Sequence, residues 1–127
     1  MNVVDSSAWL EYFADGPAAG FFAPAIEDTG KLLVPTVSLY EVFKRMMQQM
    51  GENAALNAVA IMQKGEVVDF TASLALSAVN LSVKHKLPMA DSVMYASARA
   101  FDATFWTQDA DFEDLPHVRY RGRAQAR

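Results

Sequence analysis

The chain has 127 residues, a hydrophobic content of 52% and a formal net charge of −4, which suits one domain built around one core. It contains no cysteine, which excludes disulfides and thiolate-bound metals, so any metal would be held by oxygen ligands or by the two histidines. No stretch has the roughly 18 uncharged apolar residues of a membrane span, and strand-like residues begin directly after Met1, so we expect a cytoplasmic protein without a signal peptide.

The charge is unevenly distributed along the chain. Four arginines lie in the last nine residues without an acid among them, which leaves seven basic against fifteen acidic residues, or −8, in the remainder. This is not the basic footprint of a duplex-binding domain, so a nucleic-acid substrate would need local basic patches and metal ions to offset the acidic body. The four are Arg119, Arg121, Arg123 and Arg127.

Short apolar strands alternate with amphipathic helices through the first half of the chain. In order, we expect a strand at Val3 and Val4, a helix from Ser6 or Ser7 to Phe13, a helix over 17–28, a strand over Leu32–Val34, and helices over 36–50 and 52–64. Gly30 and Gly51 separate elements there, because glycine interrupts regular structure. The last two helices should form a hairpin.

The second half continues the same alternation. We expect a strand over Glu66–Phe70, a helix over 72–86 capped by Thr71, an Ala-rich helix after Leu87-Pro88, a strand over Thr104–Thr107, an acidic turn, a short strand over Val118–Tyr120 and a flexible tail at 122–127. Alternating short strands and helices indicate an α/β sandwich around a mostly parallel sheet, in a single domain spanning residues 1–127.

Four acids hold corresponding positions relative to these elements. Asp5 follows the first strand and Asp109 comes shortly after the fourth, while Glu41 lies early in the helix after the second strand. Asp91 lies in the first turn of the Ala-rich helix. Because ligands of open α/β sheets bind outside the carboxyl ends of the strands, we expect these acids at one edge.

A cluster of four carboxylates indicates a metal-dependent hydrolytic site. Four such groups repel one another unless a cation lies between them. Mg²⁺ or Mn²⁺ prefers carboxylate oxygens, lowers the pKa of water and neutralises charge on a phosphate, which is what cleavage of a phosphodiester requires.

Each acid also has an ordinary structural explanation. Asp5 could cap a helix, and Glu41 could form an ion pair with a base one turn further along its helix. Asp91 could stabilise a helix N-terminus, and Asp109 could cap a turn together with Asp111. We favour metal ligands because all four share one edge of the sheet.

Other catalytic and binding sites find less support. His85 and His117 have no ligand-like spacing, no serine has the context of a nucleophile, and the six glycines are too scattered for a phosphate loop. A receiver-like signalling module with Asp69 as phospho-acceptor would want a second acid near Asp5 and a lysine beyond Lys86, and neither is present.

Three segments resemble the PIN-domain family, and more narrowly the VapC-type toxin ribonucleases of bacterial type II toxin–antitoxin systems. They are VVDSSAWLEYF at 3–13, PTVSLYEVFKR at 35–45 and LPMADSVMYASARAFDATFWTQDADF at 87–112, and the resemblance covers essentially the whole chain. It implies a three-layer α/β/α sandwich and an endoribonuclease whose Mg²⁺ or Mn²⁺ is held by Asp5, Glu41, Asp91 and Asp109. Ser6 and Thr107 match small hydroxyl positions beside the first and fourth of these acids.

The resemblance also implies partners: an RNA substrate, a VapB-like antitoxin whose tail lies across the active-site groove, and a second copy of the toxin in a homodimer. Surplus apolar residues between Val37 and Met62 would suit an antitoxin groove or simply pack within the helical hairpin. A catalytically silent scaffold with the same fold is the main alternative. For the fourth acid we predict Asp109 as ligand, with Asp111 in the first turn of a short helical segment that Asp109 caps.

Overall fold

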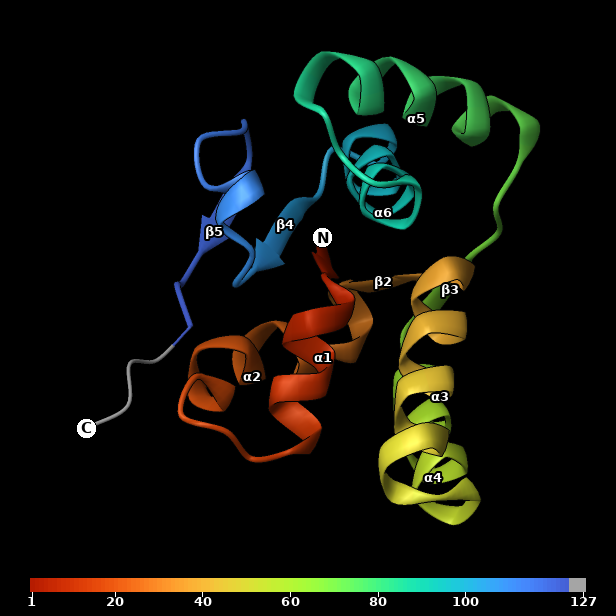
Figure 1. Ribbon diagram of the computed structural model, residues 1–127, viewed down its shortest axis with the longest axis vertical. Coiled ribbons are helices and arrows are strands. Elements are labelled where there is room, and N and C mark those ends of the chain that lie inside the picture. The colour runs from red at the N-terminus through yellow and green to blue at the C-terminus, as the bar shows by residue number, and fades with distance from the viewer. Residues whose placement is uncertain (124–127) are drawn as a thin grey trace.

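In the computed structural model, which describes residues 1–123, five short strands form one sheet with helices on both faces (Figure 1). The strands are β1 (Asn2–Val4), β2 (Leu32–Pro35), β3 (Glu66–Val68), β4 (Thr104–Thr107) and β5 (Val118–Tyr120). They lie in the order β3-β2-β1-β4-β5, and each of the four pairings between neighbours is parallel. The expected α/β/α sandwich around a parallel sheet is confirmed.

The helices connect the strands and cover the sheet. They are α1 (Ser6–Phe13), α2 (Ala19–Glu27), α3 (Thr36–Met50), α4 (Glu52–Met62), α5 (Ala72–His85) and α6 (Met89–Ala100), with 3₁₀ turns η1 (Thr29–Lys31) and η2 (Ala110–Phe112). Within the described residues, no helix is long and apolar enough to cross a membrane.

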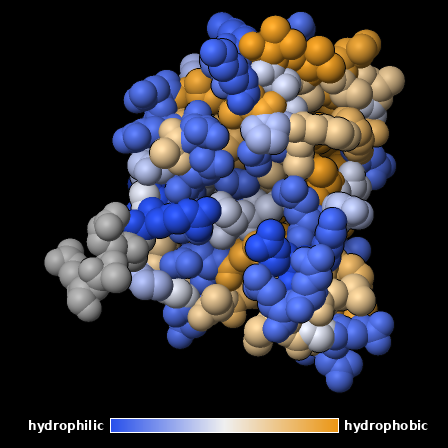
Figure 2. Space-filling model, viewed as in Figure 1, coloured by the Kyte–Doolittle hydropathy of each residue, from blue (hydrophilic) through white to orange (hydrophobic). Residues whose placement is uncertain are grey.

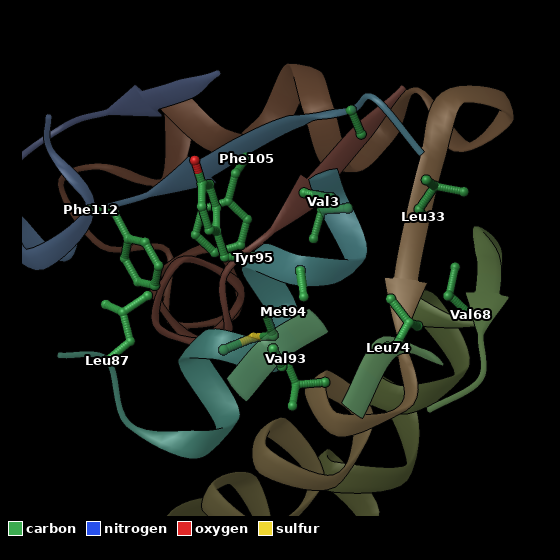
Figure 3. Close-up of a cluster of buried hydrophobic side chains, with 14 residues drawn as sticks. Val3, Leu33, Val68, Leu74, Leu87, Val93, Met94, Tyr95, Phe105 and Phe112 are labelled. Atoms are coloured by element: carbon green, nitrogen blue, oxygen red, sulfur yellow. The ribbon is translucent and has the colours of Figure 1, made fainter. Parts of the chain in front are cut away.

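Alternation of side chains along the strands builds one core on each face of the sheet. Val3 of β1 is in register with Leu33 and Phe105 on the neighbouring strands, and these side chains pack with residues of α5 and α6 (Figure 3). Val4 and Trp106 point to the other face, where the helices from α1 to α4 cover the sheet. Both faces of the central strands are therefore buried.

Tyr95 of α6 lies in the core that α5 and α6 cover, and it contacts both β4 and the chain after η2. Tyr95 packs against Phe105 and Phe112 with ring centroids 5.7 and 5.8 Å apart. Its hydroxyl donates a hydrogen bond to the carbonyl oxygen of Pro116 at 2.7 Å. These contacts fix the position of α6 relative to the end of β4. Asp91 lies in the first turn of α6, and Asp109 follows β4.

Several boundaries differ from those expected. β3 ends at Val68 rather than Phe70, because Val68 pairs with Pro35, the last residue of β2, and the chain beyond has no partner strand. α4 ends at Met62 rather than 64, and α2 begins at Ala19. Residues 121–123 have no regular structure, and the rest of the expected flexible tail lies outside the described residues.

Candidate metal centre

A cavity of about 740 Å³ opens at the carboxyl edge of the sheet, between α1 and α3. All four predicted acids line it: Asp5, Glu41, Asp91 and Asp109. In Figure 2, hydrophilic residues gather over α3, which forms one wall of this cavity. Chain segments that are far apart in sequence thus bring the predicted acids together, as parallel strands that share one edge should.

Asp5 lies at the centre of the edge and is held by two hydroxyl groups. Its side chain is only 3% exposed, and the hydroxyls of Ser7 and Thr107 donate to its Oδ2 atom at 3.0 and 2.7 Å. Burial raises the pKa of Asp5, while these two hydrogen bonds act in the opposite direction. Asp5 occupies the N-cap position of α1, but its side chain makes no capping hydrogen bond, so capping does not explain it.

Ser6 and Ser7, which follow Asp5, both line the cavity but make different hydrogen bonds. The Oγ atom of Ser6 lies 3.3 Å from the sulfur of Met94. Ser7 is the serine whose hydroxyl donates to Asp5. Thr107 does lie beside both acids, because it donates to Asp5 and accepts a hydrogen bond from the backbone N–H of Asp109 at 2.9 Å.

The acidic turn after β4 has the arrangement expected from the sequence. Asp109 is the N-cap of η2, and its Oδ1 atom accepts a hydrogen bond from the backbone N–H of Asp111 at 2.9 Å. Asp111 lies in the first turn of η2, where its side chain is exposed and does not line the cavity. Asp109 is therefore the acid of this turn that faces the cavity.

Asp91 shows that the acids share one electrostatic environment. Its carboxyl group is partly buried in the first turn of α6, and its pKa is raised to about 7. Burial is the largest cause, followed by the charges of Asp5, Asp109, Glu41 and Asp111 in that order. A cation placed among these carboxylates would remove this repulsion.

The side chains that line the cavity offer the oxygen ligands that a hard divalent cation prefers. The acids provide carboxylate oxygens, which Mg²⁺ and Mn²⁺ prefer, and neither His85 nor His117 lines the cavity. Among residues 1–123, no group of three or more His, Cys, Asp or Glu side chains has the arrangement needed to hold a metal ion.

Polar and charged residues other than the four predicted acids also line the cavity. They are Glu11 of α1, Lys44, Arg45, Gln48 and Gln49 of α3, Gln108 after β4, and Arg123. The α3 residues follow Glu41 at spacings of three, four, seven and eight residues, which places them on the same face of the helix. That spacing was the signal in the sequence that could have identified them.

The raised pKa of Asp91 predicts a pH dependence of stability in metal-free protein. A carboxyl group whose pKa is higher in the folded than in the unfolded state binds more protons when folded, so its contribution to stability is lost as pH rises towards about 7. We expect the free energy of unfolding of wild type, relative to Asp91→Asn, to fall between about pH 4 and pH 7. Urea unfolding of both proteins in EDTA measures this difference, and a value that does not change with pH would contradict the prediction.

The sequence matches one family model over most of its length. The PIN domain model matches residues 3–118. A search of curated proteins found no match.

Solved structures with a similar fold include proteins of toxin–antitoxin pairs. A toxin–antitoxin complex from Klebsiella pneumoniae has a TM-score of 0.77 at 18% identity, over 94% of this chain and 96% of the other. VapC20 of Mycobacterium tuberculosis, described as a toxin that cleaves the sarcin–ricin loop, has a TM-score of 0.78 at 21% identity, over 93% and 97%. DNA-bound VapBC from Salmonella typhimurium has a TM-score of 0.72 at 13% identity, over 95% and 96%.

Proposed function

The chain belongs to the PIN domain family, and on that basis we propose that it is a metal-dependent endoribonuclease that acts as the toxin of a toxin–antitoxin pair. The observation that carries this proposal is the cavity that Asp5, Glu41, Asp91 and Asp109 all line. PIN domains are generally nucleases, and proteins of similar fold are described as toxins, one of which cleaves the sarcin–ricin loop of RNA.

In this proposal the four carboxylates hold Mg²⁺ or Mn²⁺. When bound, such an ion lowers the pKa of water and neutralises negative charge on the phosphate and the leaving oxygen. Thr107 and Ser7 keep the carboxylate of Asp5 in one orientation, and Thr107 also links it to the backbone of Asp109. This hydrogen-bonded set gives the cavity a fixed wall against which a phosphodiester can be positioned.

The rim provides the positive charge that an RNA backbone requires. Lys44, Arg45 and Arg123 line the same cavity as the acids, so they can bind the phosphates that flank the one to be cleaved. Tyr40 is exposed beside them, with the Lys44 ammonium 5.8 Å from its ring centroid. An exposed ring next to a cation suits an unpaired base, so single-stranded or looped RNA is the proposed substrate class.

An antitoxin and a second toxin copy are the proposed protein partners. Two of the structures of similar fold are described as a toxin–antitoxin complex and as VapBC bound to DNA. Packing within the α3–α4 hairpin uses only part of its apolar surface, because Val42, Ala58 and Met62 are buried but several large side chains remain exposed. The exposed ones are Tyr40, Met47, Met50, Leu56 and Ile61.

A VapB-like antitoxin segment lying over this surface would block entry to the neighbouring cavity. The proposed site of action is the cytoplasm, where an RNA substrate and an antitoxin made with the toxin would both be found.

Cleavage assays on purified, antitoxin-free protein test the proposed activity. We expect the protein to cut single-stranded or looped RNA in the presence of Mg²⁺ or Mn²⁺, to stop on addition of EDTA, and to resume when metal is restored in excess. Activity that persists in EDTA would contradict metal dependence. Absence of cleavage on any RNA pool would instead favour a catalytically silent scaffold.

A further inference from the structure

Exposed arginines continue from the cavity along β5. Arg119 belongs to β5, Arg121 follows the last residue of that strand, and Arg123 lines the cavity. All three side chains are exposed. The ladder that joins β5 to β4 extends to Arg121, because its backbone N–H donates a hydrogen bond to the carbonyl oxygen of Thr107 at 3.0 Å. Arg119 and Arg121 therefore point to the same face of the sheet, since side chains two residues apart in a strand share a face.

Arg119 lies over a ring whose own position is fixed. Its guanidinium carbon is 4.7 Å from the ring centroid of Trp106. The indole N–H of Trp106 donates to Oδ1 of Asn2 at 2.8 Å, and its ring packs against Phe21 of α2 with centroids 5.4 Å apart. A guanidinium over a ring keeps its N–H donors at the edge of its plane, where they can bind two oxygens of one phosphate. Arg119 is thus oriented before a ligand arrives, which reduces the entropy lost on binding.

Arg121 is attached to the residue that orients the central acid. The carbonyl oxygen of Thr107 accepts the hydrogen bond from Arg121, and the hydroxyl of Thr107 donates to Asp5 at 2.7 Å. Arg121 therefore follows β5 at the same edge of the sheet at which Asp5 follows β1. We call Arg119, Arg121 and Arg123 the β5 arm, because they lead from the acidic cavity along that strand.

The cavity has basic residues on two sides. Lys44 and Arg45 of α3 line one side, and Arg123 lines the other. In Figure 1, α3 and β5 lie on opposite sides of α1. The chain up to residue 118 contains seven basic and fifteen acidic residues, so its net charge repels anions elsewhere. A ligand that uses both basic sides must therefore be a polyanion long enough to span the cavity.

The spacing of the β5 arm suits a single nucleic-acid strand. Alternate residues of a β-strand are separated by about 6.7 Å. This is close to the distance between neighbouring phosphates in an extended nucleic-acid strand. Arg119 and Arg121 can therefore contact successive phosphates of one RNA strand.

We propose that Arg119 and Arg121 bind phosphates of the RNA on the β5 side of the cavity, so that one RNA strand crosses the acids between α3 and the β5 arm. The proposal rests on the proposed ribonuclease function and adds the path of its substrate. Because these two arginines do not line the cavity, they contact phosphates away from the one that is cleaved. Such contacts hold the substrate and the transition state equally, so their loss should raise KM and leave kcat nearly unchanged.

Fluorescence anisotropy with a labelled single-stranded RNA of about 12 nucleotides tests the β5 arm, in EDTA so that no RNA is cut. The β5 double variant, Arg119→Gln with Arg121→Gln, should bind this RNA at least about tenfold more weakly at low salt. Loss of two phosphate contacts should also lower the slope of log Kd against log salt by about 1.4, roughly 0.7 for each phosphate. This slope reports ionic contacts with the RNA, which a merely structural role of the arginines would not change.

The matched control removes two positive charges at the opposite edge of the sheet. Lys31 and Lys64 are exposed, precede β2 and β3, and do not line the cavity. Lys31→Gln combined with Lys64→Gln should therefore keep the affinity and the salt slope of wild type. Thermal midpoints show whether both double variants remain folded, since Arg119→Gln uncovers part of the Trp106 ring.

Cleavage kinetics with Mg²⁺ provide a second measurement on the same proteins. In the β5 double variant, KM for the same RNA should rise at least about tenfold, while kcat should stay within about twofold of wild type. A fall in kcat with KM unchanged would contradict the placement of these arginines on phosphates away from the cleaved one.

The outcomes separate this proposal from the ribonuclease function. Unchanged RNA affinity and salt slope in the β5 double variant would overturn the proposal, and cleavage by the same protein would leave the ribonuclease function intact. Binding that depends on the β5 arm without any cleavage would support the RNA path and contradict the proposed activity. If wild type binds no RNA, the proposal fails and the arginines are left to an acidic segment of a protein partner.

Discussion

Replacing Asp91 by asparagine is expected to lower the initial rate of RNA cleavage by more than about 100-fold, a larger loss than is usual for residues that only support a metal ligand. Asparagine keeps the shape of the side chain but removes the charge that the cation requires. The pKa of Asp91 is raised by burial and by the charges of the neighbouring acids, so this carboxyl interacts with each of the other three predicted ligands. Its loss should therefore affect the whole site while relieving repulsion in the metal-free fold.

The matched control for this variant is Asp102→Asn. Asp102 is exposed, lies outside the cavity, and has a left-handed backbone with φ of 54°, which asparagine also tolerates. Its cleavage rate and thermal midpoint should stay close to those of wild type. Full activity in Asp91→Asn, measured beside this control, would remove Asp91 from the site.

The second large effect is expected at Asp109, in contrast to Asp111. Asp109→Asn should lose most of the cleavage activity, yet it should stay folded because the amide oxygen can still accept the hydrogen bond from the Asp111 backbone N–H. Asp111→Asn should keep most of the activity, because this exposed side chain lies outside the cavity. Its cost should be on the order of 0.5 kcal/mol of stability, from a lost favourable charge at a helix start.

Initial cleavage rates and thermal midpoints of the two variants, measured side by side, decide between the acids. If Asp111→Asn is the inactive one, then the fourth acid has been assigned two residues too early. Loss of activity in both would indicate that the whole turn must keep its charge.

The sheet and the acidic edge could be predicted because short-range patterns determine both. β4 has the predicted bounds, Thr104–Thr107, since threonine and aromatic residues are enriched in strands. Once the strands are parallel, the residues that follow them must meet at one edge, so Asp5 and Asp109 could be placed together without any knowledge of packing.

Features that depend on tertiary contacts could not be predicted in the same way. Ser6 and Ser7 start α1 about 100° apart around its axis, and the contact of the Ser6 hydroxyl with the sulfur of Met94 joins residues 88 positions apart in the sequence. β3 ends where its partner β2 ends, which the apolar run Glu66–Phe70 does not reveal. The basic rim on α3 has the composition of an ordinary solvated helix face until the cavity is seen beside it.

The central claim is that the four carboxylates form a cation site, and calorimetric titration with Mn²⁺ tests it most directly. Wild type, free of antitoxin and stripped of metal, should show saturable binding. Asp91→Asn should bind at least about tenfold more weakly, because one charged ligand is lost while the fold and the other three acids remain. Equal Mn²⁺ binding by the two proteins, or no binding by wild type, would contradict the assignment of Asp5, Glu41, Asp91 and Asp109 as a metal centre.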